Sequence, residues 1–526
     1  MRRRLLRRAA TGWARRAAFA RLHLKRTTRG ADRIDCYHKW TAAYSFFLNS
    51  EDILTTTTIS HISVDRLHDQ FDVALDFTPG LNVVYGKNGR GKTTILHILA
   101  NVLEADFSRF RFLQFREIRI RTHGGGSFRL ERTVNPTYEL RVFLDGQTLA
   151  VLNDENELPT EVRATIRDAL GDRPVYLPAF RAILERVRSD AYIDPSSRDT
   201  AFERIRLSER QILVDEGMSR PRAAYPSGRF DQSALTARKT IQCREWFGPF
   251  VPVVRYPSIM EVTDRLSTEF REAQLETGSQ ERRMLSEMFV EVFRALLSEE
   301  DVPSESEVDT LMARVRTALE ADETGTPYGG TYSDQLGVRL SEAAGLQRGS
   351  NQGGAAERRV LKLYAQMLER RNQERQSAFA KVRLFEAAVN KFLDDKTLHV
   401  TDDRNDRTRS RGVYVETENG RSYSLGSLSS GERQVLTMLF SATRMSTATG
   451  IFLIDEPELS LHIDWQRIIL SELMSQAGGR QIIACTHSPE VGADHLDAVQ
   501  IFSPDTVFDP LPSQTRDESE SLDDPL

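Results

Sequence analysis

The sequence has few cysteines and no long apolar runs. Its three cysteines, Cys36, Cys243 and Cys485, lie far apart, which excludes a disulfide framework and the close spacing of a zinc site. No stretch approaches the ~20 apolar residues that a membrane span needs. Histidine is absent between His123 and His399, so the middle of the chain cannot supply a histidine-based nuclease site. These absences favour a cytoplasmic protein that does not span a membrane.

Acidic residues are absent from residues 1–30, which carry ten Arg and one Lys. Beyond them the chain has 60 basic and 76 acidic residues, a net charge of −16, so the total charge of −5 gives no argument for nucleic-acid binding. The Arg-rich segment resembles a mitochondrial transit peptide, except that it lacks serine. It also fits a basic arm that binds nucleic acid or anionic lipid. The favoured alternative is a disordered extension or an over-long gene start.

Alternating hydrophobicity from Thr58 onward predicts the first folded block. Residues 59–65 and 71–77 alternate apolar and polar side chains, which is typical of two antiparallel strands with one buried face. Residues 80–86 predict a more buried strand, and residues 93–103 have helical spacing. Further strands are predicted at 115–122, 127–133 and 140–146, with turns at Gly124–Gly126 and Asn135–Pro136, and residues 173–180 end this block.

The middle of the chain changes to amphipathic helices rich in Glu and Arg. These helices are predicted at 201–217, 258–276, 281–300 and 357–395. The last one does not hold a heptad over the three to four repeats that a coiled coil needs, which favours a helical insert or lid over a long rod. Strand-like segments return at 397–403, 412–420 and 421–428, with a hairpin turn at 418–420.

The residues "GKNGRGKTT", 86–94, match the phosphate-binding loop pattern between a predicted strand and a predicted helix. Backbone N–H groups of such a loop surround phosphate oxygens at the positive end of the helix dipole. Lys92 is predicted to reach the β- and γ-phosphates, and Thr93 to hold Mg²⁺. The predicted nucleotide-binding residues of the loop are Gly86, Lys87, Asn88, Gly89, Arg90, Gly91, Lys92, Thr93 and Thr94.

Two buried strands downstream end in residues suited to phosphate chemistry. In "GIFLIDEPELSLH", 450–462, Asp455 ends an apolar run, at the strand edge where ligands bind in open α/β sheets. Asp455 is predicted to contact Mg²⁺, directly or through water, and Glu456 to activate a water. In "RQIIACTHSPE", 480–490, His487 is placed to touch a γ-phosphate or the attacking water. The alternatives are that Asp455 and Glu456 form a solvated strand end and that His487 is structural. Because the chain also has a phosphate loop, the functional roles are favoured.

A fourth stretch, "LSSGERQ" at 428–434, lies between a predicted strand and an apolar run. Ser429 and Ser430 can cap a helix, and Gly431 relaxes the backbone there. The order of the four stretches resembles the ABC-type ATPase family, in the soluble branch that includes SMC, RecF and OLD-like proteins. The chain is similar there to PtuA-like anti-phage defence ATPases.

The resemblance implies an α/β P-loop head, a mixed β-sheet with flanking helices, interrupted by a large helical insert. It implies ATP and Mg²⁺ as cofactors, Lys92 and Glu456 in catalysis and His487 as the switch histidine. It implies that Ser429 and Gly431 face the nucleotide of a second copy of the chain. A D-loop is implied at Leu459–His462, where His462 replaces the usual Asp of transporters, and Gln114 is the candidate Q-loop ligand of the metal.

The expected organisation has five parts. They are a basic extension at 1–55, a first ATPase lobe at 56–180, a helical insert or lid at 181–395, a second lobe at 396–507 and an acidic, disordered tail at 508–526.

The resemblance implies a Mg²⁺-dependent ATPase dimer that controls a nucleic-acid-linked process, phage defence or DNA repair. Only about forty residues follow His487, too few for the Toprim nuclease of OLD proteins, so a nuclease or other effector would act in trans. Direct binding of nucleic acid stays open. A membrane-transport ATPase is disfavoured by the more than three hundred residues between phosphate loop and signature. A non-hydrolysing nucleotide sensor or scaffold is disfavoured because Lys92 and Glu456 are present.

Overall fold

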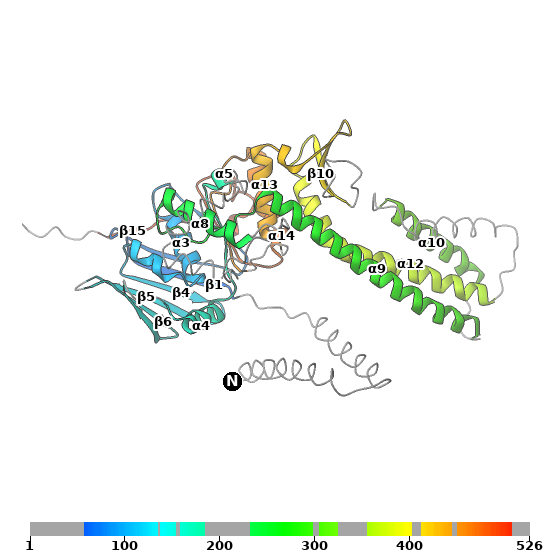
Figure 1. Cartoon of the computed structure of the whole chain (residues 1–526), viewed down its shortest axis with the longest axis horizontal. Coiled ribbons are helices and arrows are strands. Elements are labelled where there is room, and N and C mark those ends of the chain that lie inside the picture. The colour runs from blue at the N-terminus through cyan, green and yellow to red at the C-terminus, as the bar shows by residue number, and fades with distance from the viewer. Residues whose placement is uncertain are drawn as a thin grey trace, which may run out of the picture. The chain divides into compact units, whose positions relative to one another are not determined.

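The computed structural model describes residues 57–134, 137–153, 158–184, 232–297, 304–324, 355–401, 412–443 and 450–507. The basic extension, the acidic tail, the helix predicted at 201–217 and the turn at Asn135–Pro136 lie outside these residues. Within them the chain forms three β-sheets with helices on and between the sheets (Figure 1).

Sheet A has seven antiparallel strands in the order β15-β2-β1-β4-β5-β6-β7. The strands are β1 (Ile59–Leu67), β2 (Phe71–Asp76), β4 (Glu117–Thr122), β5 (Ser127–Thr133), β6 (Glu139–Leu144), β7 (Gln147–Leu152) and β15 (Asp505–Thr506). The predicted alternation is confirmed, since Ile62 of β1 pairs with Leu75 of β2 and both are buried. Strand β7 was not predicted. It follows a two-residue turn in which Asp145 and Gly146 both have positive φ, 50° and 79°.

Sheet B has five parallel strands in the order β14-β3-β13-β12-β8. The strands are β3 (Leu81–Tyr85), β8 (Val175–Leu177), β12 (Phe452–Asp455), β13 (Ile482–Thr486) and β14 (Val499–Ile501). Both faces are covered: Ile482 and Ala484 of β13 belong to one core, and Ile483 and Cys485 to the other. Two-sided burial explains the continuous apolar runs of these strands. Strands from both ends of the sequence therefore form one sheet.

Helices cover both faces of sheet B. Helix α3 (Lys92–Leu103) lies between sheets A and B, and its Ile95 and Leu99 share a core with Val84 of β3 (Figure 1). Helices α13 (Ser430–Ala442) and α14 (Ile463–Ala477) pack against the opposite face. The short elements are η1 (Phe107–Phe112), α4 (Thr160–Leu170), α5 (Arg181–Leu184), η4 (Leu425–Ser427) and η5 (Leu496–Ala498).

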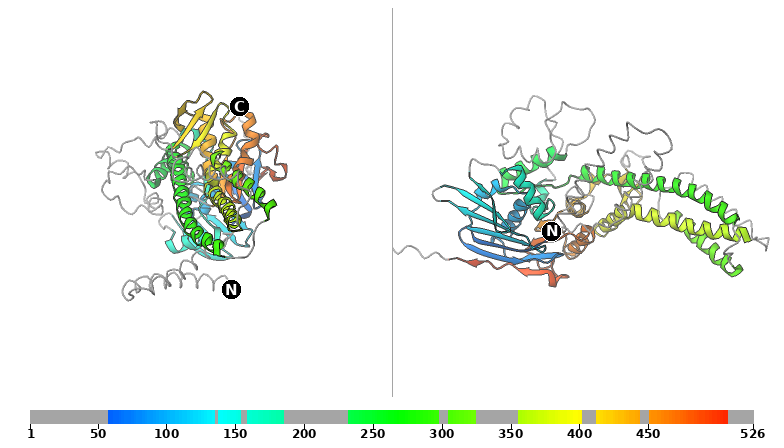
Figure 2. Two further views of the ribbon diagram at one scale, coloured as in Figure 1. Left: turned by 90° about the vertical axis from the view of Figure 1, so that its right-hand side faces the viewer. Right: turned by 90° about the horizontal axis from the view of Figure 1, so that it is seen from below.

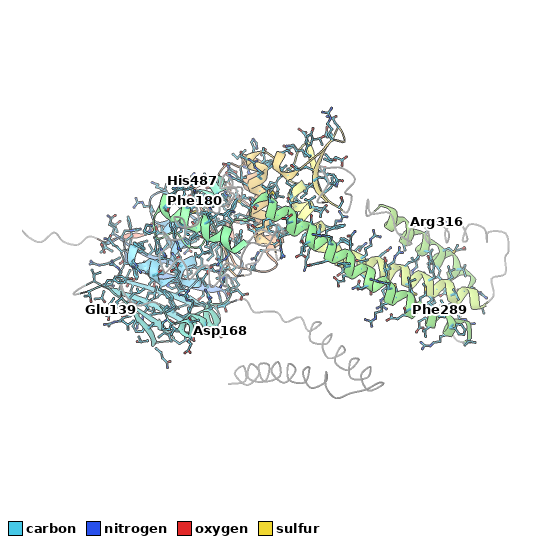
Figure 3. The ribbon with its side chains drawn as sticks, viewed as in Figure 1. Glu139, Asp168, Phe180, Phe289, Arg316 and His487 are labelled. Atoms are coloured by element: carbon cyan, nitrogen blue, oxygen red, sulfur yellow. The ribbon has the colours of Figure 1, made fainter. Side chains whose placement is uncertain are left out.

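The insert is built on long helices. They are α8 (Gln232–Phe247), α9 (Ile259–Leu297), α10 (Glu305–Thr324) and α12 (Ala355–Asn390). Helix α9 has 39 residues, ~58 Å of helix, and joins the two helices predicted at 258–276 and 281–300. It runs beside α12 (Figures 1 and 2), and Phe270 and Phe379 meet with ring centroids 5.0 Å apart. Phe289 is exposed in the C-terminal half of α9 (Figure 3).

The start of α9 and the end of α12 are anchored in one hydrophobic core. Leu266 of α9 and Phe385 of α12 are fully buried in the core that also holds α13 and α14. Sheet C follows α12 with β9 (Lys396–Val400), β10 (Val413–Thr417) and β11 (Ser422–Tyr423), in the order β11-β10-β9. Across the described ranges, no helix is long and apolar enough to cross a membrane.

The predicted fold class is confirmed. The structure is a P-loop α/β head in which sheets with flanking helices are interrupted by a helical insert. The parallel and antiparallel strands occupy separate sheets, whereas the sequence predicted one mixed sheet. The insert boundaries at 181 and 396 coincide with the first residues of α5 and β9 and remain predictions.

Candidate functional site

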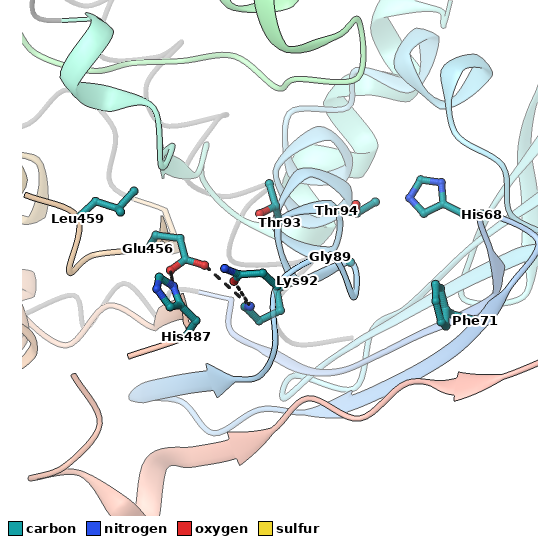
Figure 4. Close-up of a pocket in the computed structure, with 11 residues that line it drawn as sticks. His68, Phe71, Gly89, Lys92, Thr93, Thr94, Glu456, Leu459 and His487 are labelled. Atoms are coloured by element: carbon teal, nitrogen blue, oxygen red, sulfur yellow. Dashed lines mark hydrogen bonds and ion pairs between the residues drawn. The ribbon is translucent and has the colours of Figure 1, made fainter. Parts of the chain in front are cut away.

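A cavity of about 520 Å³ opens where the phosphate loop meets the ends of β12 and β13 (Figure 4). Its lining residues are His68, Phe71, Asn88, Gly89, Gly91, Lys92, Thr93, Thr94, Glu456, Leu459 and His487. They come from the β1–β2 turn, the phosphate loop and the ends of two buried strands. The volume lies in the usual range of a small-molecule or cofactor site.

The phosphate loop needs its glycines for conformation and for space. Gly89 and Gly91 have φ of 76° and 100°, which side chains rarely tolerate. A Cβ on Gly86 would lie 3.0 Å from the backbone oxygen of Phe502. Gly91 is the N-cap of α3, so the N–H groups of the first helical turn point into the loop and favour an anion there.

Lys92 lies at the centre of the loop. Its Nζ donates hydrogen bonds to the carbonyl oxygens of Gly86 and Lys87, at 2.7 and 3.1 Å. The side chain is buried by the loop that it serves. Figure 4 shows the ammonium facing Glu456, with 3.8 Å between Nζ and Oε1. The arrangement places one positive charge among backbone dipoles.

Thr93 and Asp455 connect the phosphate loop to the end of β12. The Thr93 hydroxyl donates to Asp455 Oδ2 at 2.8 Å. Burial raises the pKa of Asp455 to about 6, and the hydrogen bond from Thr93 opposes that rise. Among the described residues Asp455 Oδ1 has no hydrogen-bond partner, although it is buried. A hydroxyl and a carboxylate with a free oxygen are ligands that Mg²⁺ prefers, so this pair fits the ion.

The third predicted metal ligand, Gln114, lies elsewhere. Its side chain is exposed and does not line the cavity. Its backbone carbonyl accepts a hydrogen bond from the N–H of His68, which does line the cavity, at 2.8 Å. The structure therefore brings Gln114 to the rim through its backbone, and its role as a ligand stays a prediction.

Glu456 and His487 meet at the wall of the cavity. Glu456 has a φ of 48° and its N–H donates to the carbonyl oxygen of Cys485 at 2.8 Å. Its carboxylate forms a short hydrogen bond with Nδ1 of His487 (Figure 4). Burial and the neighbouring Glu458 raise the pKa of Glu456 to about 7, and His487 opposes the rise. A carboxyl group poised near neutral pH is suited to proton transfer.

The signature stretch lies outside this cavity. Ser429 is the N-cap of α13: its hydroxyl accepts from the N–H of Glu432, whose carboxylate accepts from the N–H of Ser429, which forms a capping box. A Cβ on Gly431 would lie 3.0 Å from the carbonyl oxygen of Ser460. Neither Ser429 nor Gly431 lines the cavity of the described chain. The signature packs on the D-loop rather than on its own phosphate loop.

His462, in the predicted D-loop, has a local structural role. It directly precedes α14, and its Nδ1 accepts a hydrogen bond from the N–H of Asp464 at 3.5 Å. His462 therefore acts as the N-cap of α14 in the place where transporters usually have Asp. Leu459 lines the cavity, so the other end of the D-loop reaches the site.

Arg181 is a residue that sequence reasoning missed. It is completely buried, and its guanidinium donates to the carbonyl oxygens of Pro178, Asp455, Glu456 and Pro457, at 3.3, 3.0, 2.9 and 3.0 Å. These bonds hold the turn that follows β12. No local pattern links residues 274 positions apart, so the sequence carried no signal for this contact.

His68 and Phe71 were also missed. They flank the β1–β2 turn and line the cavity on the side of the loop away from Glu456 and His487 (Figure 4). His68 has a positive φ of 54°, which is uncommon outside glycine. The two rings beside a turn were the only sequence feature that could have indicated a binding role. The alternating pattern around them predicted strands and no site.

Two family models match the chain. A model described as "AAA domain" matches residues 66–192, and one described as "AAA domain, putative AbiEii toxin, Type IV TA system" matches residues 291–494.

Curated relatives match shorter stretches. "Retron Ec83 probable ATPase" of Escherichia coli is 35% identical over 88 residues, 15% of this chain and 16% of the relative. "Retron Vc95 probable ATPase" of Vibrio cholerae serotype O1 biovar El Tor is 26% identical over 149 residues, 25% of this chain and 28% of the relative. The chain thus covers less than a third of the length of either relative.

Solved structures of Smc head domains are similar over most of the chain. The Pyrococcus furiosus Smc head with an extended coiled coil, bound to the C-terminal domain of ScpA, has 12% identity and a TM-score of 0.36, and covers 86% of this chain and 96% of its own. The Pyrococcus yayanosii Smc head with a coiled coil and joint has 14% identity and a TM-score of 0.32, and covers 83% and 93%.

The phosphate loop, Glu456 after β12 and His487 after β13 line one cavity, an arrangement that fits the P-loop fold of the ABC type. The matches to AAA-domain models and to two probable ATPases agree with the ATPase family that the sequence resembles.

Proposed function

We propose that the chain hydrolyses ATP with Mg²⁺, closes as a dimer around two nucleotides and thereby controls an effector in trans. The observation that carries the proposal is the hydrogen bond between Thr93 and Asp455, which joins the phosphate loop to the strand end that bears Glu456. One cavity is therefore lined by Lys92 for phosphate, Thr93 for Mg²⁺, Glu456 for proton transfer and His487.

Each residue has a distinct role in the proposed hydrolysis. Lys92 and the loop N–H groups bind the β- and γ-phosphates, and Thr93 and Asp455 hold Mg²⁺, which supplies charge neutralisation when bound. Glu456 takes a proton from water as the water oxygen attacks the γ-phosphorus. The bond from phosphorus to the β–γ bridging oxygen breaks, and ADP and phosphate leave. His487 orients Glu456 and contacts the γ-phosphate.

The position of the signature supports a dimer. Ser429 and Gly431 lie outside the cavity of their own chain, at the N-terminus of a 13-residue helix. The positive end of that helix dipole suits a phosphate. In the proposed dimer, this surface completes the site formed by Gly86–Thr94 of a second copy. Each active site then needs two chains.

The proposed process is phage defence or DNA repair, with a nuclease or other effector as a separate protein. Two relatives are named as probable ATPases of retrons, which supports the ATPase part of the proposal, and the process rests on the resemblance to anti-phage ATPases. The insert, 181–395, contains no histidine that could serve a nuclease. Catalysis on nucleic acid would therefore come from the partner.

Phosphate release by the purified full chain tests the proposal. We expect steady-state hydrolysis of ATP that stops with EDTA and returns with Mg²⁺. Lys92→Ala should abolish it, whereas Lys381→Ala, at an exposed lysine of α12, should not. No Mg²⁺-dependent phosphate release by the folded wild type, with or without nucleic acid, would contradict the assignment.

A further inference from the structure

Glu458 is a buried carboxylate beside the site to which the proposed hydrolysis gives no role. It lies three positions after Asp455, and its side chain is 5% exposed. Its Oε1 accepts three hydrogen bonds: from the Thr486 hydroxyl at 2.5 Å, and from the N–H groups of His487 and Ser488 at 3.1 Å each. All three donors belong to the turn that ends β13.

These bonds determine where His487 can lie. Strands β12 and β13 are parallel neighbours with Asp455 opposite Cys485, so the residues after each strand emerge side by side. Hydrogen bonds to a charged carboxylate are stronger than bonds between neutral groups. A buried carboxylate that accepts several of them is therefore held firmly in place. The same Oε1 lies 3.2 Å from Nδ1 of His487.

The turn is braced internally as well. The N–H of Ser488 also donates to the Thr486 hydroxyl at 3.0 Å, and the Ser488 hydroxyl donates to Gln466 of α14 at 2.9 Å. Glu458 is the member of this network that comes from the turn after β12. It therefore links the strand end bearing Glu456 to the strand end bearing His487.

We propose that Glu458 is a positioning residue: by holding the turn 486–488 it sets the orientation of His487 toward Glu456 and the reacting phosphate. The inference rests on the proposed ATPase function and deepens it. Glu458 does not touch nucleotide, since it does not line the cavity. Its removal should slow turnover and leave nucleotide binding, which the phosphate loop provides, nearly unchanged.

If Glu458 had a purely structural role, its variants would behave differently. The following variants distinguish a positioning role from a structural one. Glu458→Gln keeps an oxygen that can accept the three hydrogen bonds, and Glu458→Ala removes every acceptor. Glu472→Ala is the matched control, because Glu472 of α14 is also buried and pairs with Lys391 away from the cavity. Each variant is compared in kcat, KM and urea midpoint, using the full chain.

We expect Glu458→Ala to lower kcat ~10- to 100-fold with KM within about twofold, as displaced supporting residues do. Glu458→Gln should recover most of that loss, and Glu472→Ala should leave kcat unchanged. The double variant with His487→Ala is decisive. If Glu458 acts through His487, Glu458→Ala/His487→Ala should turn over no more slowly than His487→Ala alone.

Two results would overturn the inference and leave the ATPase assignment in place. One is that the losses in kcat of the two single variants multiply in the double variant, and the other is that Glu458→Ala has the same kcat as the control. An inactive wild type would instead overturn the ATPase assignment and the inference together. If Glu458→Ala does not fold, Glu458→Asp replaces it in the cycle, because it keeps the charge but shortens the reach.

Discussion

At the scale of single residues, the site is organised by polar side chains that bond to backbone carbonyls and to one another. Lys92 donates to two loop carbonyls and is buried by them, whereas an isolated loop lysine would be exposed. Asp455 and Glu456 are neighbours in sequence with different partners, because one faces Thr93 and the other faces His487. These environments fit the roles of metal ligand and proton acceptor that we propose for them.

Lys92→Ala should weaken ATP binding ~10- to 100-fold. A charged hydrogen bond is worth ~1.5–3 kcal/mol, and each 1.4 kcal/mol changes affinity about tenfold. Lys92→Met is the matched variant, because it keeps the apolar stem and removes only the charge. Titration with a fluorescent ATP analogue measures both. Wild-type affinity in either folded variant would exclude the proposed role of Lys92.

Glu456→Gln should lower kcat ~10²- to 10⁴-fold, the usual contribution of a general base. ATP binding should persist, because the phosphate loop is untouched. Glu416→Gln, at a residue of β10 that does not line the cavity, serves as the control. Single-turnover phosphate release measures the chemical step. Turnover of Glu456→Gln at the wild-type rate would remove Glu456 from catalysis.

At the scale of elements, the site residues lie at the ends of strands. The turn after β12 is held by Arg181, which is distant in sequence. The sequence predicted β3, β12 and β13 because buried parallel strands are continuous apolar runs, and it predicted Asp455 and His487 because they end such runs. It could not predict Arg181 or Glu458, whose partners lie in other elements. Strand β7 was missed because its Asp145–Gly146 turn was included in the preceding strand.

Arg181→Met should destabilise the protein by ~2–4 kcal/mol. It removes the donors for four carbonyl oxygens, most of them buried, and an unsatisfied buried acceptor costs ~1–3 kcal/mol. Arg181→Lys should lose less, because an ammonium has three donors. Urea denaturation measures both changes against Arg316→Met on α10. A midpoint for Arg181→Met equal to that control would show that the turn after β12 does not depend on Arg181.

Ser429→Asp should separate the capping role of Ser429 from its proposed role in a shared site. Asp is as good an N-cap as Ser, so the urea midpoint should stay close to that of the wild type. Its carboxylate would repel the phosphate of a second subunit, so ATPase activity should fall at least tenfold. Full activity in this variant would leave Ser429 as a helix cap alone.

At the scale of the whole molecule, residues that precede and follow the helical insert in sequence line one cavity. Sheet B joins β3, which precedes the insert, to β12 and β13, which follow it. Ser429 and Gly431 remain outside the cavity that this sheet positions. The central claim is therefore that a complete site needs two chains.

Mixing two inactive variants tests that claim most directly. Lys92→Ala has a defective phosphate loop and an intact signature, and Ser429→Arg has the reverse. In a heterodimer of the two, one site carries both defects and the other carries none. Steady-state ATPase is measured on each variant alone and on the mixture, with subunit exchange confirmed by differently tagged chains.

We predict that each variant alone is inactive and that the mixture recovers part of the wild-type rate. Recovery should rise with the fraction of heterodimer. An inactive mixture in which heterodimers are present would contradict the shared site, because each chain would then carry its own complete defect.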